Sequence, residues 1–388
     1  MTLRGRRIHL VGSAAPNCAE AHLAYAHDLV QALACELNKE GANFMIPFGK
    51  EPFLAGRSTG PSIIFDWTVA QTVAAALAAG TVAPKGPNGR LVTTLATDKL
   101  HKHMPPTRRP IFEELQKRDA MNLEFCPPGW SAGAVRRQRQ AQLGDIMIAI
   151  SGGEGTEHLA EEYLEHGKPV VPLDLELGAS SGDGSGGATK LFGRALADPA
   201  HFFQVTAGNS AASLLDQART LGGTRSVLDV AQAIVRLLLA LVPPRVFYVR
   251  MLNDSLPEYP SVEGFFRNTV DPFVRELGYE PLQMGIGPND FAWMNKAIFD
   301  LLHRSAVAFV DLTGLRPNCF MELGYALGHQ QRIIVATRDD TRFPFDAFAL
   351  EAFQWKLGED PSSQRDRLRT HWERNIDMPT LVRPKSAT

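Results

Sequence analysis

The residue of this chain whose position most suggests chemistry is a glutamate in apolar surroundings. Glu322 lies in the segment FMELG, after a loop that begins at Asp311 and follows the apolar run SAVAFV. Apolar neighbours raise the pKa of a carboxyl, whereas the start of a helix lowers it. A carboxylate held beside C1 of a ribose can stabilise an oxocarbenium-like centre or attack it. An ordinary acid near a helix start, with Asn318 as the N-cap, explains the pattern equally well.

Three other residues of the second half are candidates for binding a substrate. Asp311 ends a predicted strand, where it could bind a ribose or fix the following loop by Asx-type hydrogen bonds. Arg250 ends the first predicted strand of this half and could contact a phosphate or be a plain surface arginine. Asn318 could hold a ribose hydroxyl or cap the helix. Each of these residues could therefore have a purely structural role instead of binding a substrate.

Two small-residue turns of the first half predict a site of nucleotide size. The segment ISGGEGTEHLAEE places Gly152, Gly153 and Gly155 between a predicted strand and a helix, and VGSAA places Gly12 and Ser13 at the end of another strand. Glycines let the backbone approach a ligand, and the N–H groups of a helix start attract an anion such as phosphate. A single turn of this kind also occurs where a helix simply packs on a strand. The prediction therefore rests on the presence of two such turns in one sheet.

A Gly/Ser-rich segment over 175–193 follows a predicted strand and precedes a predicted helix. Its composition is that of a flexible loop. Its position is also that of a loop that covers a ligand.

The composition excludes several classes of protein. The chain has 388 residues, 44% of them hydrophobic, and a formal net charge of −2, so no basic excess indicates a nucleic-acid partner. No run approaches the roughly 18 apolar residues of a membrane span, and no signal peptide is visible. Four cysteines, none in a CxxC pair, predict neither a zinc site nor disulfides and favour the cytoplasm.

The order of predicted elements indicates two α/β domains. The pair Pro243–Pro244 separates a helical pattern from the strand-like RVFYVRML, which predicts domains 1–242 and 243–388. Strands alternate with helices in both halves, a pattern typical of mainly parallel sheets flanked by helices. We therefore expect two Rossmann-like domains whose ligands bind at the carboxyl ends of the strands.

The first half resembles the SLOG superfamily of Rossmann-like nucleotide-binding proteins, through VGSAA, RRQRQAQLGDIMIAISGGEGT and GKPVVPL. The resemblance implies a nucleotide site that includes Arg136, the glycine turn with Thr156, and the loop residues Gly187 and Lys190. Leu159 occupies the position of the catalytic glutamate of the enzyme members, and a leucine cannot do acid–base chemistry. The resemblance therefore implies ligand binding by the first half, and Leu159 argues against catalysis there. SLOG domains beside TIR effectors sense nucleotide signals, including cyclic ADP-ribose isomers.

The second half resembles the TIR-like and nucleoside 2-deoxyribosyltransferase-like group. The carriers are AVAFVDLTGLRPNCFMELGYALGHQQRIIVAT and a later PFD, with Arg316 and Cys319 as modest departures from the group pattern. In this group the ELG glutamate is the catalytic carboxylate, so the resemblance implies that role for Glu322. It implies either cleavage of NAD or chemistry on nucleosides.

Together these resemblances predict a cytoplasmic, homo-oligomeric antiphage effector that senses a nucleotide-derived signal and cleaves the N-glycosidic bond of NAD. A nucleosidase or deoxyribosyltransferase and a non-catalytic sensor or scaffold are the alternatives. A third, phosphoribohydrolase activity in the first half, conflicts with Leu159. We expect NAD as a substrate, no tightly bound cofactor, no metal, and neither a nucleic-acid nor a membrane partner.

Overall fold

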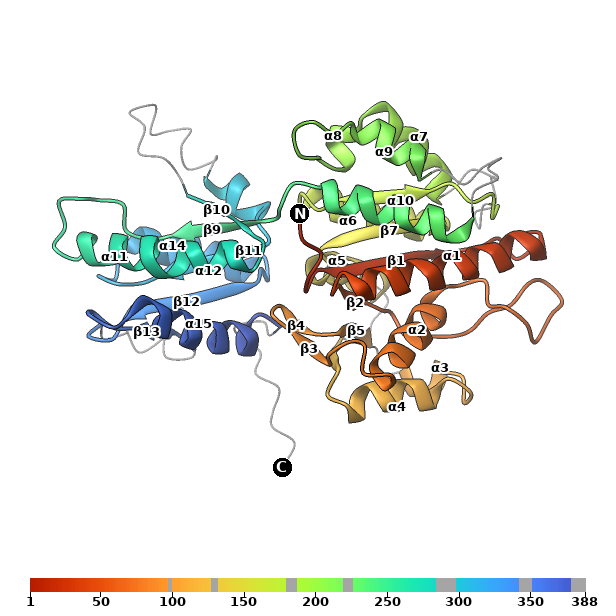
Figure 1. Cartoon of the computed structure of the whole chain (residues 1–388), viewed down its shortest axis with the longest axis horizontal. Coiled ribbons are helices and arrows are strands. Elements are labelled where there is room, and N and C mark those ends of the chain that lie inside the picture. Colours follow the sequence, from red (N-terminus) through yellow and green to blue (C-terminus); the bar gives the residue numbers. More distant parts are fainter. Residues whose placement is uncertain are drawn as a thin grey trace. The chain divides into compact units, whose positions relative to one another are not determined.

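The computed structural model describes residues 1–96, 100–126, 132–178, 187–218, 226–283, 298–341 and 351–377. The chain folds into two compact units. Unit 1 consists of Met1–Gly86 and Arg90–Val242, and unit 2 consists of Pro87–Gly89 and Pro243–Thr388. The main boundary coincides with the Pro243–Pro244 pair, and each unit contains its own sheet (Figure 1).

Unit 1 is built on a six-stranded parallel sheet with the order β6-β5-β2-β1-β7-β8. The strands are β1 (Arg7–Ser13), β2 (Asn43–Met45), β5 (Val92–Ala96), β6 (Met121–Phe125), β7 (Ile146–Ser151) and β8 (Val170–Leu173). The strand order reverses between β1 and β7, where Gly12 pairs with Ile150 and Ser13 pairs with Ser151. In open α/β sheets the crevice outside such a reversal is where ligands bind. Both predicted small-residue turns leave the sheet at this point.

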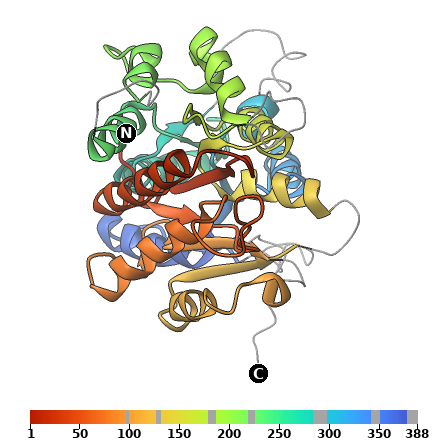
Figure 2. The same cartoon turned by 90° about the vertical axis from the view of Figure 1, so that its right-hand side faces the viewer.

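Helices cover both faces of this sheet (Figures 1 and 2). Helix α1 (Glu20–Lys39) contacts α10 (Val227–Ala240) and α2 (Asp66–Ala78), which in turn contacts α4 (Arg109–Lys117). The buried residues of α1 recur every three or four positions, the spacing of a helix with one apolar face. A second contacting series comprises α5 (Ala132–Leu143), α6 (Glu154–Glu165) and α7 (Gly187–Ala197). The short helices are α3 (Leu100–His103), α8 (Pro199–Phe202) and α9 (Ala211–Gln217).

Unit 2 has a five-stranded parallel sheet with the order β10-β9-β11-β12-β13. The strands are β9 (Arg245–Val249), β10 (Glu280–Leu282), β11 (Val307–Asp311), β12 (Ile333–Arg338) and β13 (Phe353–Trp355). Numbered within the unit, this is the 2-1-3-4-5 order of the flavodoxin-like fold, with its reversal between β9 and β11. The two parallel sheets with flanking helices confirm the predicted α/β class.

The helices of unit 2 pack against two separate clusters of buried side chains. One cluster joins the sheet to α11 (Tyr259–Phe265), α12 (Asp271–Glu276) and α15 (Pro361–Asn375), and the other joins it to α14 (Pro317–Gly328). The sequence predicts that Pro272 kinks or splits its helix. The structure instead inserts a π-helical segment, η1 (Phe266–Val270), between α11 and α12. Pro272 has no N–H to give to a helical bond, and the wider turn is a known way to accommodate such a gap.

Three residues from the first half of the chain belong to unit 2. They form the tip of the hairpin β3 (Lys85–Gly86) and β4 (Gly89–Arg90). The buried Asn88 accepts a hydrogen bond of 3.2 Å from the indole N–H of Trp372. The chain therefore connects the two units at this hairpin as well as at Pro243.

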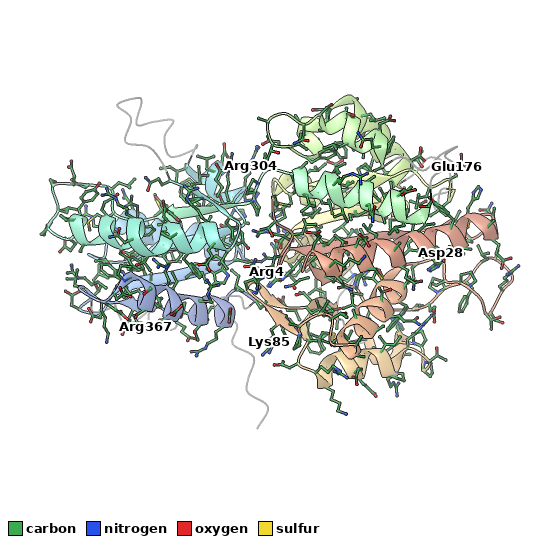
Figure 3. All side chains as sticks on the ribbon, viewed as in Figure 1. Arg4, Asp28, Lys85, Glu176, Arg304 and Arg367 are labelled. Carbon is green, nitrogen blue, oxygen red and sulfur yellow. The ribbon has the colours of Figure 1, made fainter. Side chains whose placement is uncertain are left out.

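Charged side chains are distributed over both units (Figure 3). Of those labelled there, Lys85 forms an ion pair with Asp119 at 2.5 Å and Arg367 forms one with Glu359 at 3.1 Å. Within the described ranges, no helix is long and apolar enough to cross a membrane. The same ranges contain no group of three or more His, Cys, Asp or Glu side chains that could hold a metal ion.

Candidate active site

Glu322 lies on the helix that follows the strand beside the reversal point of unit 2. The chain leaves β11 at Asp311, makes a loop and enters α14 with Pro317 as the first helical residue. Pro317 suits that position because its missing N–H would have no partner there and its φ is already helical. The N-cap is therefore Arg316, so the alternative that Asn318 caps the helix was wrong: Asn318 is the exposed second residue of the helix. Contact of Asn318 with a ribose hydroxyl stays a prediction. Glu322 consequently lies in the second turn, where the helix dipole acts weakly.

The Glu322 carboxyl is half-buried, and burial is the cause of its perturbed pKa. Across the described ranges no hydrogen bond or ion pair reaches it, and burial raises its pKa to about 7. Of the two opposing effects that the sequence leaves open, burial therefore prevails. A half-buried carboxyl without a partner is costly for a fold, and such groups concentrate at functional sites.

Asp311 is buried and hydrogen-bonded at the carboxyl end of β11. Its Oδ2 accepts a bond of 2.8 Å from the Trp355 indole N–H, and its Oδ1 accepts one of 3.1 Å from the Thr313 backbone N–H. Burial raises the pKa of this carboxyl to about 6, although both hydrogen bonds oppose the rise. The bond from Thr313 is of the Asx type that fixes a loop, and the bond from Trp355 joins the end of β11 to β13. Contact of Asp311 with a ribose stays a prediction.

The thiol of Cys319 lies within electrostatic range of both carboxyls, those of Glu322 and Asp311. This side chain is buried, and burial, followed by the charges of Glu322 and Asp311, raises its thiol pKa to about 12. Both carboxyls therefore lie within electrostatic range of one buried sulfur atom. A thiol with so high a pKa is not a nucleophile at neutral pH.

Arg250 follows β9 on the other side of the reversal point, but its guanidinium is already engaged. It pairs with Glu263 at 2.7 Å, donates to Gln283 at 3.1 and 2.7 Å, and lies over the Phe266 ring. A substrate phosphate would have to compete with these partners. The predicted phosphate contact is therefore weakly supported by the geometry.

Arg338, which the sequence analysis missed, provides a second cation at this edge. It ends β12, and its guanidinium donates to Ser261 at 3.0 Å and pairs with Asp340 at 2.6 Å. The hydrogen bond and charge of Asp340, followed by the charges of Glu258 and Asp311, raise its pKa, and the effect of Asp311 places Arg338 near the end of β11. A basic residue at the end of the buried run RIIVAT was the signal that could have identified it.

We expect Glu322→Gln to stabilise the folded protein at alkaline pH. The raised pKa means that the folded state keeps a proton that the unfolded state, with the usual pKa of 4.5, has released. Ionising Glu322 therefore costs stability increasingly from pH 4.5 to about 7 and fully above it, by about 1–3 kcal/mol. Thermal unfolding of both proteins at pH 4 and pH 8 measures this. Equal differences in Tm at the two pH values would contradict the prediction.

In unit 1 the two small-residue turns meet at the reversal point. The Gly152 N–H donates to the Ser13 carbonyl at 2.8 Å, so the end of β1 fixes the turn after β7. Ser151 has a left-handed backbone, with φ of 49°, and its hydroxyl donates to the Gly178 carbonyl. Gly153 is the N-cap of α6, whose first N–H groups have no partner within the helix. Phosphate binding there stays a prediction.

The start of α7 lies against the same turn. A Cβ on Gly187 would lie 2.3 Å from the Gly152 carbonyl oxygen. The Glu157 carboxylate accepts a bond of 3.1 Å from the Gly187 N–H and pairs with Lys190 at 2.8 Å. Gly187 and Lys190 are thus brought to the glycine turn. Both contact Glu157, an acid to which the sequence assigned no ligand role.

The arginine positions differ from the expectation. Arg136 is exposed. Its charge acts on the carboxyl of Asp66: burial raises the pKa of Asp66 to about 7, and Arg136 opposes this rise. It is the next residue, Arg137, that approaches Gly155 and donates to His158 at 3.0 Å. Helix geometry turns neighbouring residues about 100° apart, so one position decides which arginine faces the turn.

The remaining predicted residues of the turn lie on the inner side of α6. Thr156 and Leu159 are both buried, and Leu159 belongs to the hydrophobic core of unit 1. The position that carries a glutamate in the enzyme members therefore faces apolar side chains. Two acids contact α7 beside this turn: Glu157, which pairs with Lys190, and the buried Asp174, which accepts from the Thr189 hydroxyl at 3.1 Å.

A protein-family model described as "ATP nucleosidase Cap17-like, N-terminal" matches residues 3–238, more than half of the chain. The chain belongs to this Cap17-like family. The matched residues cover unit 1 almost completely, the part of the chain that resembles SLOG proteins. The SLOG and TIR-like assignments themselves stay predictions.

Two curated relatives match over both units. Proteins named "ATP nucleosidase Cap17", from Escherichia coli strain KTE188 and from Escherichia coli, are each 22% identical over 337 residues. The match covers 84% of this chain and 65% of the relative, so the chain spans just under two thirds of the length of these relatives.

Among solved structures, an α,α-trehalose 6-phosphate synthase from Burkholderia multivorans aligns over 97% of this chain and 92% of its own. It is 12% identical with a TM-score of 0.21, a value too low to support a conclusion about fold or function.

Proposed function

We propose that this protein is a nucleosidase that hydrolyses the N-glycosidic bond of an adenine nucleotide with Glu322 as its catalytic residue. The observation that carries the proposal is the half-buried carboxyl of Glu322, unpartnered within the described ranges, on the helix after β11. The reversal point of a parallel sheet is where such folds bind ligands. Membership of the Cap17-like family and the name of the two relatives support this class of reaction.

The raised pKa of Glu322 suits the removal of adenine in particular. Adenine is a poor leaving group as an anion, so cleavage of its bond to C1 requires that the base receive a proton. With a pKa of about 7, Glu322 is partly protonated at neutral pH and can donate that proton. The C1–N bond then breaks with its electron pair on the base, and a water oxygen bonds to C1 and releases a proton. Arg338 is our candidate for holding the substrate phosphates at this edge, where a phosphate would replace the exposed Asp340 carboxylate as its partner.

NAD is the second candidate substrate, favoured by the resemblance of the second half to TIR-like proteins. Its nicotinamide leaves as a neutral base without receiving a proton. Cleavage of NAD would therefore use the ionised Glu322 carboxylate to stabilise the positive charge that develops at C1. The same residue serves both substrates, but in opposite protonation states.

The pH profile of the reaction separates these two roles. If Glu322 donates a proton to adenine, kcat for ATP falls about tenfold for each pH unit above about 7. If the carboxylate stabilises the centre formed from NAD, kcat rises towards pH 7 and then stays level. Base release measured by chromatography from pH 5.5 to 9 tests this. A flat profile for both substrates would remove Glu322 from the chemistry.

A second location for the chemistry follows from the extent of the family match. It covers unit 1, where Glu157 and Asp174 bind Gly187 and Thr189 of α7 beside the glycine turn. Glu157→Gln and Asp174→Asn should each leave base release within about threefold of wild type if Glu322 is catalytic. A loss of a hundredfold or more in either variant, with Glu322→Gln active, would place the reaction in unit 1.

The role proposed for unit 1 is to bind a nucleotide-derived signal and to control unit 2. The small-residue turns, Gly187 and Lys190 would contact that ligand, and a cyclic ADP-ribose isomer is one candidate. Resemblance to SLOG–TIR effectors supports this control, an antiphage setting in the cytoplasm and activation by homo-oligomerisation. The rival is a non-catalytic sensor or scaffold. Under that rival, no nucleotide would lose its base with or without signal.

A further inference from the structure

A pocket in unit 1 lies outside both sites described above. It has a volume of about 360 Å³, large enough for a nucleoside. Its walls are the loop after β2 and the segment that leads into α4, with these lining residues: Glu51, Phe53, Ser58, Thr59, Gly60, Pro105, Thr107 and Arg108. Both segments follow the carboxyl ends of strands, the edge at which parallel sheets bind ligands.

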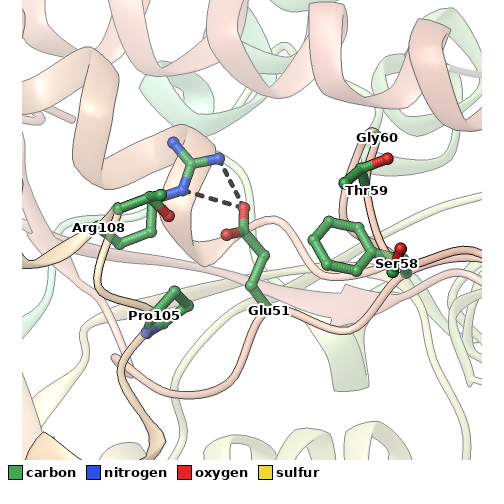
Figure 4. Close-up of a pocket in the computed structure, with 8 residues that line it drawn as sticks. Glu51, Ser58, Thr59, Gly60, Pro105 and Arg108 are labelled. Carbon is green, nitrogen blue, oxygen red and sulfur yellow. Dashed lines mark hydrogen bonds and ion pairs between the residues drawn. The ribbon is translucent and has the colours of Figure 1, made fainter.

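A fixed carboxylate forms the polar part of this pocket (Figure 4). Arg108 donates to Glu51 twice, from Nε at 3.0 Å and from NH2 at 2.6 Å, and both bonds end on the same oxygen, Oε1. Arg108 is itself held by Gln71 at 3.1 Å. The guanidinium thus orients the carboxylate, and Oε2 accepts no hydrogen bond within the described ranges. An oriented carboxylate oxygen is a strong acceptor for hydroxyl groups of a ligand.

The rest of the wall is suited to a ring with hydroxyl substituents. Phe53 is partly exposed and offers an aromatic face, and Ser58, Thr59 and Thr107 add hydroxyls. The acid and the base neutralise each other, so the pocket lacks the excess positive charge that a phosphate group needs. Aromatic faces stack on nucleobases, and carboxylates accept from the hydroxyls of ribose.

We propose that this pocket binds the nucleoside part of a ligand, with Phe53 stacked on the base and Glu51 Oε2 accepting from the ribose diol. Any phosphates of that ligand would extend out of the pocket. The proposal does not depend on the chemistry of Glu322, because it concerns binding and not turnover.

The test is calorimetric titration of the full chain carrying Glu322→Gln, with adenosine and with 2′,3′-dideoxyadenosine, which lacks the diol. Adenosine should bind at least tenfold more tightly than the dideoxy compound. Glu51→Gln should abolish that difference, and Phe53→Ala should weaken both ligands about tenfold or more. Glu114→Gln is the matched control, because it removes an exposed Glu–Arg pair with Arg118 on α4 and should change neither affinity.

The affinities of adenosine and the dideoxy compound are first compared on protein whose pocket residues are unchanged. This comparison does not depend on how well the pocket variants fold. Equal affinities for adenosine and the dideoxy compound would overturn the proposal, as would the absence of adenosine binding at millimolar concentration. Binding that survives both Glu51→Gln and Phe53→Ala would show that adenosine occupies another site, and would also overturn it.

Discussion

Glu322→Gln should reduce base release from the substrate by about a thousandfold, and most of the loss should be in kcat. An amide neither donates a proton to a leaving base at neutral pH nor carries the charge that stabilises an oxocarbenium-like centre, and either role contributes about 10²–10⁴-fold. The carboxyl has no partner in the described ranges, so the substitution leaves no other group unpaired. Steady-state release of adenine or nicotinamide, with the signal ligand present, measures the effect.

The control for this prediction is Glu373→Gln, an equivalent change at an exposed position of α15. It should retain full activity. Retention of more than a tenth of wild-type kcat by Glu322→Gln, in a protein with an unchanged Tm, would contradict the assigned role.

Gly12→Ala should destabilise unit 1 on the order of 3–5 kcal/mol, enough to prevent folding of many domains. A Cβ at this position would lie 1.7 Å from the Ile150 carbonyl oxygen, and Gly12 has φ of 151°, a region that other residues avoid. Gly12 and Ile150 are paired residues of the central strands β1 and β7, so neither backbone can move without disrupting the sheet. Urea denaturation followed by circular dichroism measures the loss.

Gly193→Ala is the matched control, because nothing lies within 4 Å of the added Cβ in the interior of α7. It should be neutral or stabilising by up to about 1 kcal/mol. If Gly12→Ala unfolded at the same urea concentration as wild type, that result would contradict the close contact between Gly12 and the Ile150 carbonyl. Loss of nucleotide binding in a fully folded Gly12→Ala protein would instead indicate a direct role in the ligand site.

The sheets could be predicted because both halves place continuous apolar runs between helical patterns. Runs such as DIMIAI and AVAFV are buried on both faces, as the strands of parallel sheets must be. Gly12 and Gly152 could be placed at the ends of strands for the same reason, whereas their meeting at the reversal point depends on the strand order. The local sequence is therefore enough to place these strands and the glycines at their ends.

At the start of α14 the local preferences of two neighbouring residues compete. Asn318 was given the N-cap because its side chain favours that place, but Pro317 precedes it and is better suited to the first helical position than to any flanking one. Applying the proline rule first would have placed the N-cap at Arg316 and Glu322 in the second turn.

Partners that come from distant parts of the chain could not be predicted. Arg250 looked available for a phosphate, but Glu263 and Gln283 reach it from two other segments. Asn88 bonds to Trp372, 284 positions away, although nothing in the hairpin sequence indicates unit 2. Tertiary packing decides such pairs, and the burial that raises the pKa of Glu322 arises in the same way.

The most direct test of the central claim is to identify the products formed from ATP by wild type and by Glu322→Gln, using mass spectrometry. The account predicts free adenine and a ribose triphosphate from wild type, and neither product from the variant at the same protein concentration. Adenine release that persists in Glu322→Gln would contradict the account and place the catalytic residue elsewhere in the chain.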